Sequence, residues 1–255
     1  MNNLCDEIKK IVKNCGIILL NCNRDDININ SKEGNNNIVT NYDLLIQNKL
    51  KKELLELLPD AGFIGEEDDI DNDINNEYIF VVDPIDGTTN FARDIKLSSI
   101  SVALLKNGKP IIGVCYNPYV DELYEAKKDS GAYLNGKQIH VSTKKLKDGI
   151  VSCGCAPYYN ELREESLKLQ NKYATIASDY RRLGSAVIEI CNVASGKVEL
   201  YFEMKLMPWD YAAASLILEE AGGVITTMDG DEIQYLNSSS VMASNGIENY
   251  LEEVK

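Results

Sequence analysis

Hydrophobic and polar positions follow helical spacing over two stretches near the start of the chain. Apolar residues recur every three or four positions over residues 3–22 and about 42–58, which predicts two amphipathic helices, the second ended by Pro59. Residues 23–37 between them are too hydrophilic to belong to a core, so they are predicted to form a mobile loop. The chain therefore begins with two helices that each have one apolar face.

Short apolar runs then indicate a change from helices to strands. Strands are expected at 61–64 and 77–82, and the second ends at Asp83-Pro84, shortly before a helix that starts near Thr88. Five more strands, joined by Asn-Gly and Asn-Pro turns, are expected at 98–105, 111–116, 122–126, 132–134 and 138–141. Tight turns favour antiparallel neighbours, so this part is predicted to be a largely antiparallel meander.

After Val151 the predicted elements alternate between helix and strand. Helices are expected near 160–172, 184–195 and 209–221, and strands at 198–203, 224–227 and 240–243. The pattern predicts an N-terminal α+β half over residues 1–145 and a C-terminal α/β half over residues 146–255. No linker is long enough to separate them, so the halves are expected to pack tightly as one unit.

Composition and charge narrow the class of protein. The 255 residues are 44% hydrophobic and 26% charged, as in globular proteins. The 26 basic and 40 acidic residues give a net charge of −14, which repels a phosphate backbone, so no nucleic-acid partner is expected. No apolar run approaches the roughly 18 residues of a membrane span, and the start of the chain is not typical of a signal peptide. These features predict a cytoplasmic protein without a membrane partner.

Cysteine and histidine usage excludes several kinds of site. The seven cysteines lack the paired spacing of a zinc site and are predicted to be reduced, mostly buried thiols. The single histidine, His140, lies in a short alternating stretch and is expected to be structural or exposed. One histidine leaves little room for a Ser-His-Asp triad or a histidine-based metalloprotease.

Three acidic segments lie at the ends of predicted elements. Asp83 and Asp86 flank Pro84, whose turn lets the two carboxylates converge, and the Ile85 carbonyl between them offers a third oxygen. Without a basic neighbour such acids repel each other unless a cation lies between them. Glu66 ends another strand, and Asp210 lies in an apolar helix start. Together these oxygens predict a Mg²⁺ site.

The same turn offers a place for an anion. Gly87 lets backbone N–H groups approach a ligand, and the helix that starts near Thr88 directs its positive end to the same point. Metal and phosphate can therefore share one pocket. Taken alone, Asp86-Gly87 is also compatible with an ordinary turn and Thr88 with a simple helix cap.

These segments resemble the signature segments of the inositol monophosphatase family of Mg²⁺-dependent, Li⁺-sensitive sugar phosphatases. The resemblance covers nearly the whole chain and implies a layered αβαβα sandwich and a homodimer. The matching segments are VTNYD (39–43), GEE (65–67), DPIDGTTNF (83–91), IGVCYNP (112–118), GAYLNG (131–136), RRLGSA (181–186), WDYAA (209–213) and EAGG (220–223).

The resemblance also implies roles for individual residues. One Mg²⁺ would bind Glu66, Asp83 and the Ile85 carbonyl, a second would bind Asp83, Asp86 and Asp210, and a third would depend on Glu66. Thr88, linked to Asp43, would orient and help to deprotonate the attacking water, and the backbone N–H groups of Gly87 and Thr88 would hold the phosphate. The implied catalytic residues are Thr88, Asp43 and Glu66.

Residues on the substrate side follow from the same resemblance. Glu203 and Ser185, with the Ala186 backbone, match positions that contact sugar or inositol hydroxyls. The segment TTNF (88–91) resembles the inositol monophosphatase branch and departs from the Thr-Lys-Glu-Phe version of the nucleotide phosphatase branch. Met207 stands where relatives often have Lys or His, and Lys32 matches a lysine of a loop that can close over the site. The implied substrate is a small phosphorylated polyol or sugar.

Several functions stay open at this stage. The leading one is hydrolysis of inositol monophosphate, and the alternatives on the same scaffold are hydrolysis of fructose 1,6-bisphosphate or of histidinol phosphate. A member without activity would act as an interaction protein, but none of the expected ligands is missing. A calcium-binding role for the acidic loop at 66–76 is disfavoured, since an EF-hand beginning at Asp69 would have Ile74 in place of Gly and Phe80 in place of Glu.

Overall fold

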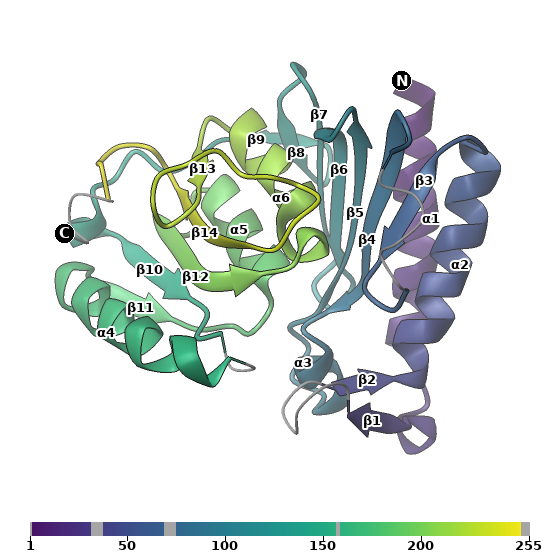
Figure 1. Cartoon of the computed structure of the whole chain (residues 1–255), viewed down its shortest axis with the longest axis horizontal. Helices are drawn as coiled ribbons and strands as arrows, with labels where there is room; N and C mark the ends of the chain where they lie inside the picture. Colours follow the sequence, from purple (N-terminus) through teal and green to yellow (C-terminus); the bar gives the residue numbers. More distant parts are fainter. Residues whose placement is uncertain (1, 32–37, 69–74, 157–158, 251–255) are drawn as a thin grey trace.

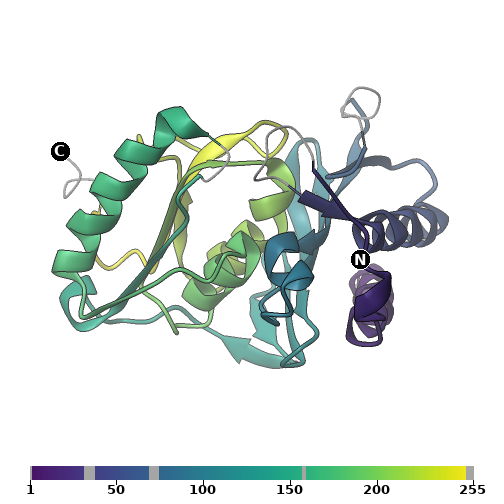
Figure 2. The ribbon, with the colours of Figure 1, turned by 90° about the horizontal axis from the view of Figure 1, so that it is seen from below.

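The computed structural model describes residues 2–31, 38–68, 75–156 and 159–250 as five stacked layers. Helices α1 and α2 cover the outer face of a seven-stranded sheet, helices α5 and α6 lie between this sheet and a five-stranded sheet, and α4 covers the far side (Figure 1). Figure 2 shows the same order from below, with α4 at one end and α1 and α2 at the other. The αβαβα sandwich expected from the sequence is confirmed.

The two N-terminal helices form where the hydrophobic pattern predicts them. Helix α1 spans Asn2–Leu20 and α2 spans Asn41–Leu57. A capping box begins α2, in which the Thr40 side chain accepts from backbone N–H groups while the Asp43 carboxylate accepts from the Thr40 N–H at 2.8 Å. Both helices bury their apolar faces against the sheet, which fixes the start of α2, and with it Asp43, next to strand β4.

The seven-stranded sheet consists of the predicted meander and the strand predicted at 61–64. Its order is β3-β4-β5-β6-β7-β8-β9, with β3 parallel to β4 and every other pair antiparallel. The strands are β3 (Gly62–Gly65), β4 (Tyr78–Asp86), β5 (Ser99–Lys106), β6 (Lys109–Asn117), β7 (Glu122–Lys127), β8 (Ala132–Leu134) and β9 (Lys137–Ile139). The parallel pairing aligns the ends of β3 and β4, since Gly65 pairs with Val82.

The five-stranded sheet contains two strands that the sequence pattern did not predict. Its order is β11-β10-β12-β14-β13, in which β10 is parallel to both neighbours. The strands are β10 (Ile150–Cys153), β11 (Asp179–Arg181), β12 (Leu200–Leu206), β13 (Val224–Thr226) and β14 (Ser239–Ser244). Strand β11 is short and lies at the sheet edge without a buried residue, so it has no hydrophobic signature. Strand β10 is apolar and buried but only four residues long, which is a weak signal in the sequence.

Helix α6 (Pro208–Glu220) is buried between the two sheets, with α5 (Ala186–Ala194) beside it, while α4 spans Asn160–Ile176. Small residues let α6 approach strand β6 closely. A Cβ added at Gly113 would lie 2.5 Å from the Ala213 carbonyl oxygen, so this contact requires glycine. The packing fixes the start of α6, where Asp210 lies.

The polar segment predicted to be a mobile loop contains structure. A short 3-10 helix spans Arg24–Asp26, and β1 (Ile29–Ser31) pairs antiparallel with β2 (Ile38–Thr40). The residues of β1 are exposed, so the strand has no apolar alternation that the sequence could reveal. Lys32 and residues 69–74 of the acidic loop lie outside the described residues.

Two expectations from the composition can be compared with the structure. All seven cysteines are free, and five of them are buried, as predicted for reduced thiols. None of the helices in the described part of the chain combines the length and the apolar character that crossing a membrane would need. The division at residues 145 and 146 stays a prediction, although the strands of the two sheets fall on either side of it.

Candidate functional site

The two aspartates of the DPID segment belong to strand β4, which is longer than predicted. The strand continues through Pro84 to Asp86, and its pairing with β5 shifts register between Asp83 and Asp86. Side chains three positions apart on a regular strand point to opposite faces, and an irregularity of this kind redirects one of them. The sequence placed these acids in a turn after the strand, whereas the structure brings them together through a bulged strand end.

Gly87 connects this strand end to the short helix α3 (Thr88–Ala92). It has a φ of 84°, and a Cβ at this position would lie 3.0 Å from the Leu97 carbonyl oxygen. A side chain here would be both strained and crowded, so the turn requires glycine. The turn places Thr88 directly after the aspartates.

Three carboxylates from two separate elements converge in the site. Oxygen atoms of Asp83, Asp86 and Asp210 all lie within 4.8 Å of one another. Asp210 belongs to the first turn of α6, where its Oδ2 accepts from the Met207 N–H at 2.7 Å. These three acids were predicted as metal ligands from separate stretches of sequence, and the fold brings them together.

Electrostatic repulsion within this group makes it a candidate cation site. Burial raises the pKa of Asp83 well above its usual range, and the charges of Glu66, Asp86 and Asp210 raise it further. Burial likewise raises the pKa of Asp210, with Asp86 and Glu66 adding to the effect. The pKa of Asp86 rises to about 7, mainly through burial. Buried acids of this kind are stabilised by a metal ion, and a set of oxygen donors suits a hard divalent cation.

Glu66 lies beside this cluster because of the parallel pairing of β3 and β4. It directly follows β3, and its N–H donates to the Val82 carbonyl at 3.2 Å, next to Asp83. Its side chain is partly exposed and lines the same cavity as the three aspartates. The Ile85 carbonyl, the other predicted ligand, also lines this cavity and accepts from the Thr88 hydroxyl at 3.0 Å.

Thr88 and Asp43 form the contact that the sequence predicted across 45 positions. The Thr88 Oγ1 lies 3.1 Å from Asp43 Oδ1, while Asp43 Oδ2 accepts from the Thr40 N–H at 2.8 Å. Burial raises the pKa of Asp43 to about 6, against the lowering effect of the Thr40 hydrogen bond. The hydroxyl of Thr88 is therefore held between a buried acid and the edge of the aspartate cluster.

Asp86 also anchors the N-terminus of helix α5. Its Oδ2 accepts from the Ser185 hydroxyl, from the Val187 N–H at 3.1 Å and from the Ser99 hydroxyl at 3.2 Å. Ser185 is the N-cap of α5 and directly precedes Ala186, so both predicted substrate-side positions lie next to the aspartates. The sequence reasoning did not identify Ser99 or Val187, since neither belongs to a recognisable motif.

A cavity of about 510 Å³ connects these groups with the C-terminal half. Its lining includes Gly87, Thr88, Ser185, Ala186 and Met207, together with Glu203. All of the predicted site residues except Asp43 therefore line this one cavity, and Asp43 is buried behind Thr88.

Glu203 lies inside strand β12 rather than at a strand end, because β12 continues to Leu206. Its side chain is only 9% exposed and accepts from the Ala156 N–H at 3.0 Å and from the Tyr201 hydroxyl at 2.7 Å. Burial raises its pKa, which these hydrogen bonds and the charge of Arg182 oppose. Glu203 is therefore a buried acid that two hydrogen bonds fix in place, and not an exposed surface acid.

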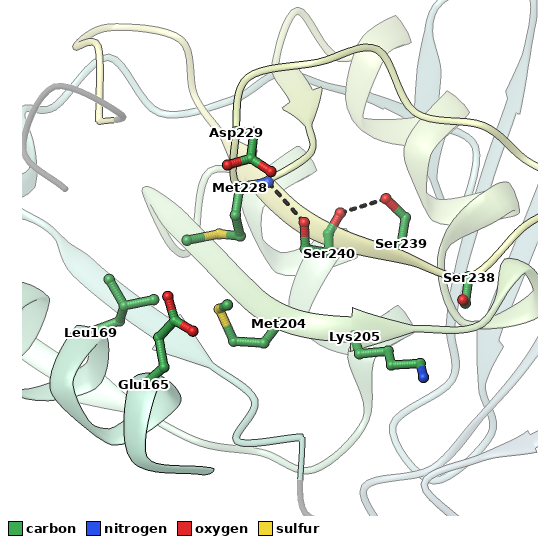
Figure 3. A pocket seen from close by; sticks show the side chains of 9 residues that line it. All are labelled: Glu165, Leu169, Met204, Lys205, Met228, Asp229, Ser238, Ser239 and Ser240. Atoms are coloured by element: carbon green, nitrogen blue, oxygen red, sulfur yellow. Dashed lines mark hydrogen bonds between the residues drawn. The ribbon is translucent and has the colours of Figure 1, made fainter. Parts of the chain in front are cut away.

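The cavity also has a basic part that the sequence reasoning missed. Arg182 and Lys205 line it, and Lys205 also lines a neighbouring cavity (Figure 3). The Lys205 Nζ lies 4.0 Å from the centre of the Tyr159 ring. Arg182 lay within a quoted motif without an assigned role, and Lys205 follows Glu203 by two positions. The pairing of β12 with β14 is irregular between Glu203 and Leu206, so strand alternation alone could not have placed Lys205.

Comparison with known proteins shows similarity over the whole chain. A model of the inositol monophosphatase family matches residues 4–254. An inositol-1-monophosphatase of Mesorhizobium japonicum is 35% identical over 220 residues, covering 85% of this chain and 82% of that protein. The Nus factor SuhB of Vibrio cholerae is 32% identical over 228 residues, covering 88% and 85%. The solved structure of an IMPase from Thermotoga maritima has a TM-score of 0.89 and 30% identity, and the match covers 100% of this chain and 97% of that one.

Proposed function

This chain belongs to the inositol monophosphatase family, and from this premise we propose that it is a Mg²⁺-dependent phosphomonoesterase that hydrolyses inositol monophosphate. The observation that carries the proposal is the convergence of Asp83, Asp86 and Asp210 within 4.8 Å, beside a hydroxyl that contacts a buried acid. The phosphatase class follows from the family, and the particular ester and metal are the proposal.

The acidic cluster fits two or three Mg²⁺ ions. Glu66, Asp83 and the Ile85 carbonyl would hold one, Asp83, Asp86 and Asp210 a second, and Glu66 would support a third. When bound, such ions acidify water and stabilise the attacking and leaving oxygens of the phosphate ester. Raised pKa values at Asp83 and Asp210 support this assignment, because carboxylates at this distance need a compensating charge.

Thr88 and Asp43 would position the attacking water. The Thr88 hydroxyl lies at the edge of the cluster and contacts Asp43 at 3.1 Å, so it can orient a water and pass a proton toward the carboxylate. The pKa of about 6 at Asp43 suits a proton acceptor near neutral pH. No histidine is required for this arrangement, in accord with a chain that has only one.

The rest of the cavity would bind the ester. Backbone N–H groups of Gly87 and Thr88 would hold the phosphate, and Glu203, Ser185 and the Ala186 backbone would contact the hydroxyl groups of the polyol. Their shared position in the lining of one cavity supports this division. Burial holds Glu203 in place for a directional hydrogen bond.

The proposal includes a cytoplasmic homodimer that is inhibited by Li⁺ and has no nucleic-acid partner. Its support is the family membership together with the acidic composition. The name Nus factor of some relatives makes nucleic-acid binding worth measuring directly in the same preparation.

Phosphate release tests the proposed function. Turnover would be measured in Mg²⁺, with and without Li⁺, on inositol 1-phosphate, fructose 1,6-bisphosphate, histidinol phosphate and 3'-phosphoadenosine 5'-phosphate. We expect the highest kcat/KM for inositol 1-phosphate and none without a divalent cation. A higher value for another ester would reassign the substrate, and no turnover by protein that binds Mg²⁺ would contradict the enzymatic role.

A further inference from the structure

The turn that precedes helix α5 is held by two side chains, one from each half of the chain. We propose that one of them, Asn90, is a positioning residue that fixes Ser185 and Ala186 relative to the aspartates. Asn90 would thereby determine how strongly the protein prefers esters that carry hydroxyl groups beside the phosphate. The proposal rests on the proposed function, in which Ser185 and the Ala186 backbone contact hydroxyl groups of the substrate.

Asn90 joins three segments through its side-chain amide. Its Nδ2 donates to the carbonyls of Leu97 and Leu183, both at 2.8 Å, and lies 3.3 Å from the Gly184 carbonyl oxygen. Only a nitrogen can donate to carbonyl oxygens, so these contacts fix the orientation of the amide. The side chain is 7% exposed and lines the active-site cavity. A buried amide therefore links helix α3 to the turn before α5 directly beside the site.

Glu189 binds the same turn through its N–H groups. Its Oε1 accepts from the Leu183 N–H at 2.6 Å and from the Gly184 N–H at 3.1 Å. The carbonyls of this turn thus point to Asn90, and its N–H groups point to Glu189. Residues 182–185 belong neither to β11 nor to α5, so side chains rather than a strand or a helix set the path of this segment.

Two glycine turns meet at this point. Gly184 has a φ of 81°, and a Cβ added at Gly87 would lie 3.1 Å from the Gly184 carbonyl oxygen. The turn before α5 therefore packs directly against the turn after β4. Ser185 follows Gly184, and its hydroxyl donates to Asp86. A shift of the turn would move Ser185 relative to the aspartates, and hydrogen bonds tolerate only small changes in distance and angle.

Helix α3, which carries the Thr88 hydroxyl proposed to position the water, has supports other than the Asn90 amide. The Phe91 N–H donates to the Gly87 carbonyl at 3.0 Å, and the Thr88 hydroxyl donates to the Ile85 carbonyl at 3.0 Å. Both hydrogen bonds use atoms that remain when the Asn90 amide is removed. We therefore expect loss of this amide to weaken the binding of substrate hydroxyls, which raises KM, and to change kcat little.

Two esters that differ in their hydroxyl groups give the sharpest experiment. The ratio of kcat/KM for inositol 1-phosphate to that for phenyl phosphate would be measured in Mg²⁺ for the wild type, Asn90→Ala and Asn90→Ser. We expect Asn90→Ala to lower this ratio about tenfold, mainly through the KM of inositol 1-phosphate, as for the loss of a hydrogen bond to the substrate. Serine keeps one donor, so Asn90→Ser should restore part of the ratio, and it provides the test if Asn90→Ala does not fold. An unchanged ratio, or an equal fall of kcat/KM for both esters, overturns the positioning role.

The matched control is Asn245→Ala. Asn245 is 2% exposed, and its Nδ2 donates to the Lys144 carbonyl at 2.8 Å, but it lies outside the described lining of the active-site cavity. The variant loses a buried amide of the same kind and should keep the wild-type ratio. If the ratio falls as far in Asn245→Ala as in Asn90→Ala, the effect is a general loosening of the fold and the positioning role is wrong.

Binding separates a failure of the proposed function from a failure of this proposal. If the wild type hydrolyses neither ester, the proposed function fails, and calorimetric titration with inositol 1-phosphate and with inorganic phosphate, both in Mg²⁺, decides the role of Asn90. Weaker binding of inositol 1-phosphate to Asn90→Ala than to the wild type, with unchanged binding of phosphate, supports the role. Equal affinity of the two proteins for inositol 1-phosphate, or equal losses for both ligands, overturns it.

Discussion

Two groups of acids with buried carboxylates, one at the end of β4 and the start of α6 and one in the C-terminal half, are stabilised in different ways. In the first group the carboxylates face one another, and in the second each carboxylate accepts hydrogen bonds from backbone N–H groups. The first group is Asp83, Asp86 and Asp210, and the second is Glu189, Glu199 and Glu203. Acids of the first group accept backbone hydrogen bonds as well, so what distinguishes it is that three carboxylates lie within 4.8 Å of one another. Burial of an acid therefore does not by itself indicate a metal site.

Acids of the second group accept hydrogen bonds from backbone N–H groups and so connect segments of the C-terminal half. Glu199 accepts from the Ile150 N–H at 2.5 Å and so joins β10 to the start of β12. Glu189 accepts from the N–H groups of Leu183 and Gly184, at 2.6 and 3.1 Å, and so shapes the turn before α5. We infer that acids of the first group contribute to activity at a cost in stability, and that acids of the second group stabilise the fold.

The largest expected effect is that of Asp86→Asn. The amide oxygen can still accept the three hydrogen bonds that Asp86 Oδ2 accepts, while the charge of one metal ligand is lost. We expect kcat/KM to fall on the order of a thousandfold. In EDTA the free energy of unfolding should rise by about 1 kcal/mol, because repulsion with Asp83 and Asp210 is removed.

Steady-state kinetics and urea unfolding would measure these two effects, with Asp229→Asn as the control for loss of one exposed carboxylate. Mg²⁺ should also raise the Tm of the wild type more than that of Asp86→Asn. If Asp86→Asn has wild-type activity, or if it is less stable than the wild type in EDTA, the proposed distinction between the two groups of acids is wrong.

Thr88→Val should have the next largest effect. Valine keeps the shape of threonine but cannot contact Asp43 or the Ile85 carbonyl by a hydrogen bond. We expect kcat to fall about a hundredfold, the usual scale of general acid–base assistance, with a small change in KM. Thr88→Ser should restore most of kcat, and Thr143→Val, at an exposed position outside the cavity, is the control. Equal kcat for Thr88→Val and the wild type would exclude Thr88 from positioning the water.

The sequence alone predicted the elements with strong hydrophobic periodicity and the acidic residues that lie in recognisable motifs. Helices α1, α2 and α6 were predicted to within a few residues, because apolar spacing and Pro59 or Pro208 define them. The acids of the cluster could be named because each lies near the start or the end of a predicted apolar element. Their convergence, however, depends on the bulge of β4 and on the approach of α6 to the sheet, which no local pattern encodes.

The sequence was not sufficient where tertiary pairing replaces local preference. Strands β1 and β11 are polar and exposed in part, so their strand conformation comes from their neighbours. Glu203 was placed at a strand end because the apolar run stops near it, yet pairing with β14 extends β12 to Leu206. Lys205 belongs to that extension, and this is why the basic part of the cavity was not anticipated.

A smaller effect, on stability alone, is expected for Glu199→Ala. Removing the carboxylate leaves the Ile150 N–H of β10 without its acceptor, which should lower the free energy of unfolding by about 2 kcal/mol. Glu199→Gln keeps an acceptor oxygen and should recover most of this loss. Urea unfolding measures the change, and kcat per folded molecule should stay within about twofold of the wild type. A large loss of kcat would show that this acid also acts in the site.

The last expected effect is a pH dependence of stability that Glu189→Gln should remove. Burial raises the pKa of Glu189 to about 7, from an unfolded value of 4.5. Between these pH values the folded state holds a proton that the unfolded state has lost, so stability falls as pH rises, by at most about 1.4 kcal/mol per pH unit. The amide of the Glu189→Gln variant would keep an oxygen that accepts from Leu183 and Gly184 but would not titrate.

From pH 4.5 to pH 7 the free energy of unfolding of the wild type should therefore fall relative to that of Glu189→Gln. Above pH 7 the difference between the two proteins should become constant. Urea unfolding of both proteins at half-unit pH intervals measures it, and Glu164→Gln, which changes an exposed acid of α4, is the control. A difference that is constant with pH would mean that Glu189 is charged in the folded state. A charged Glu189 would need a nearby cation, as the acids of the cluster do. Arg182 would be the candidate for that cation, since its guanidinium interacts with both Glu189 and Glu203.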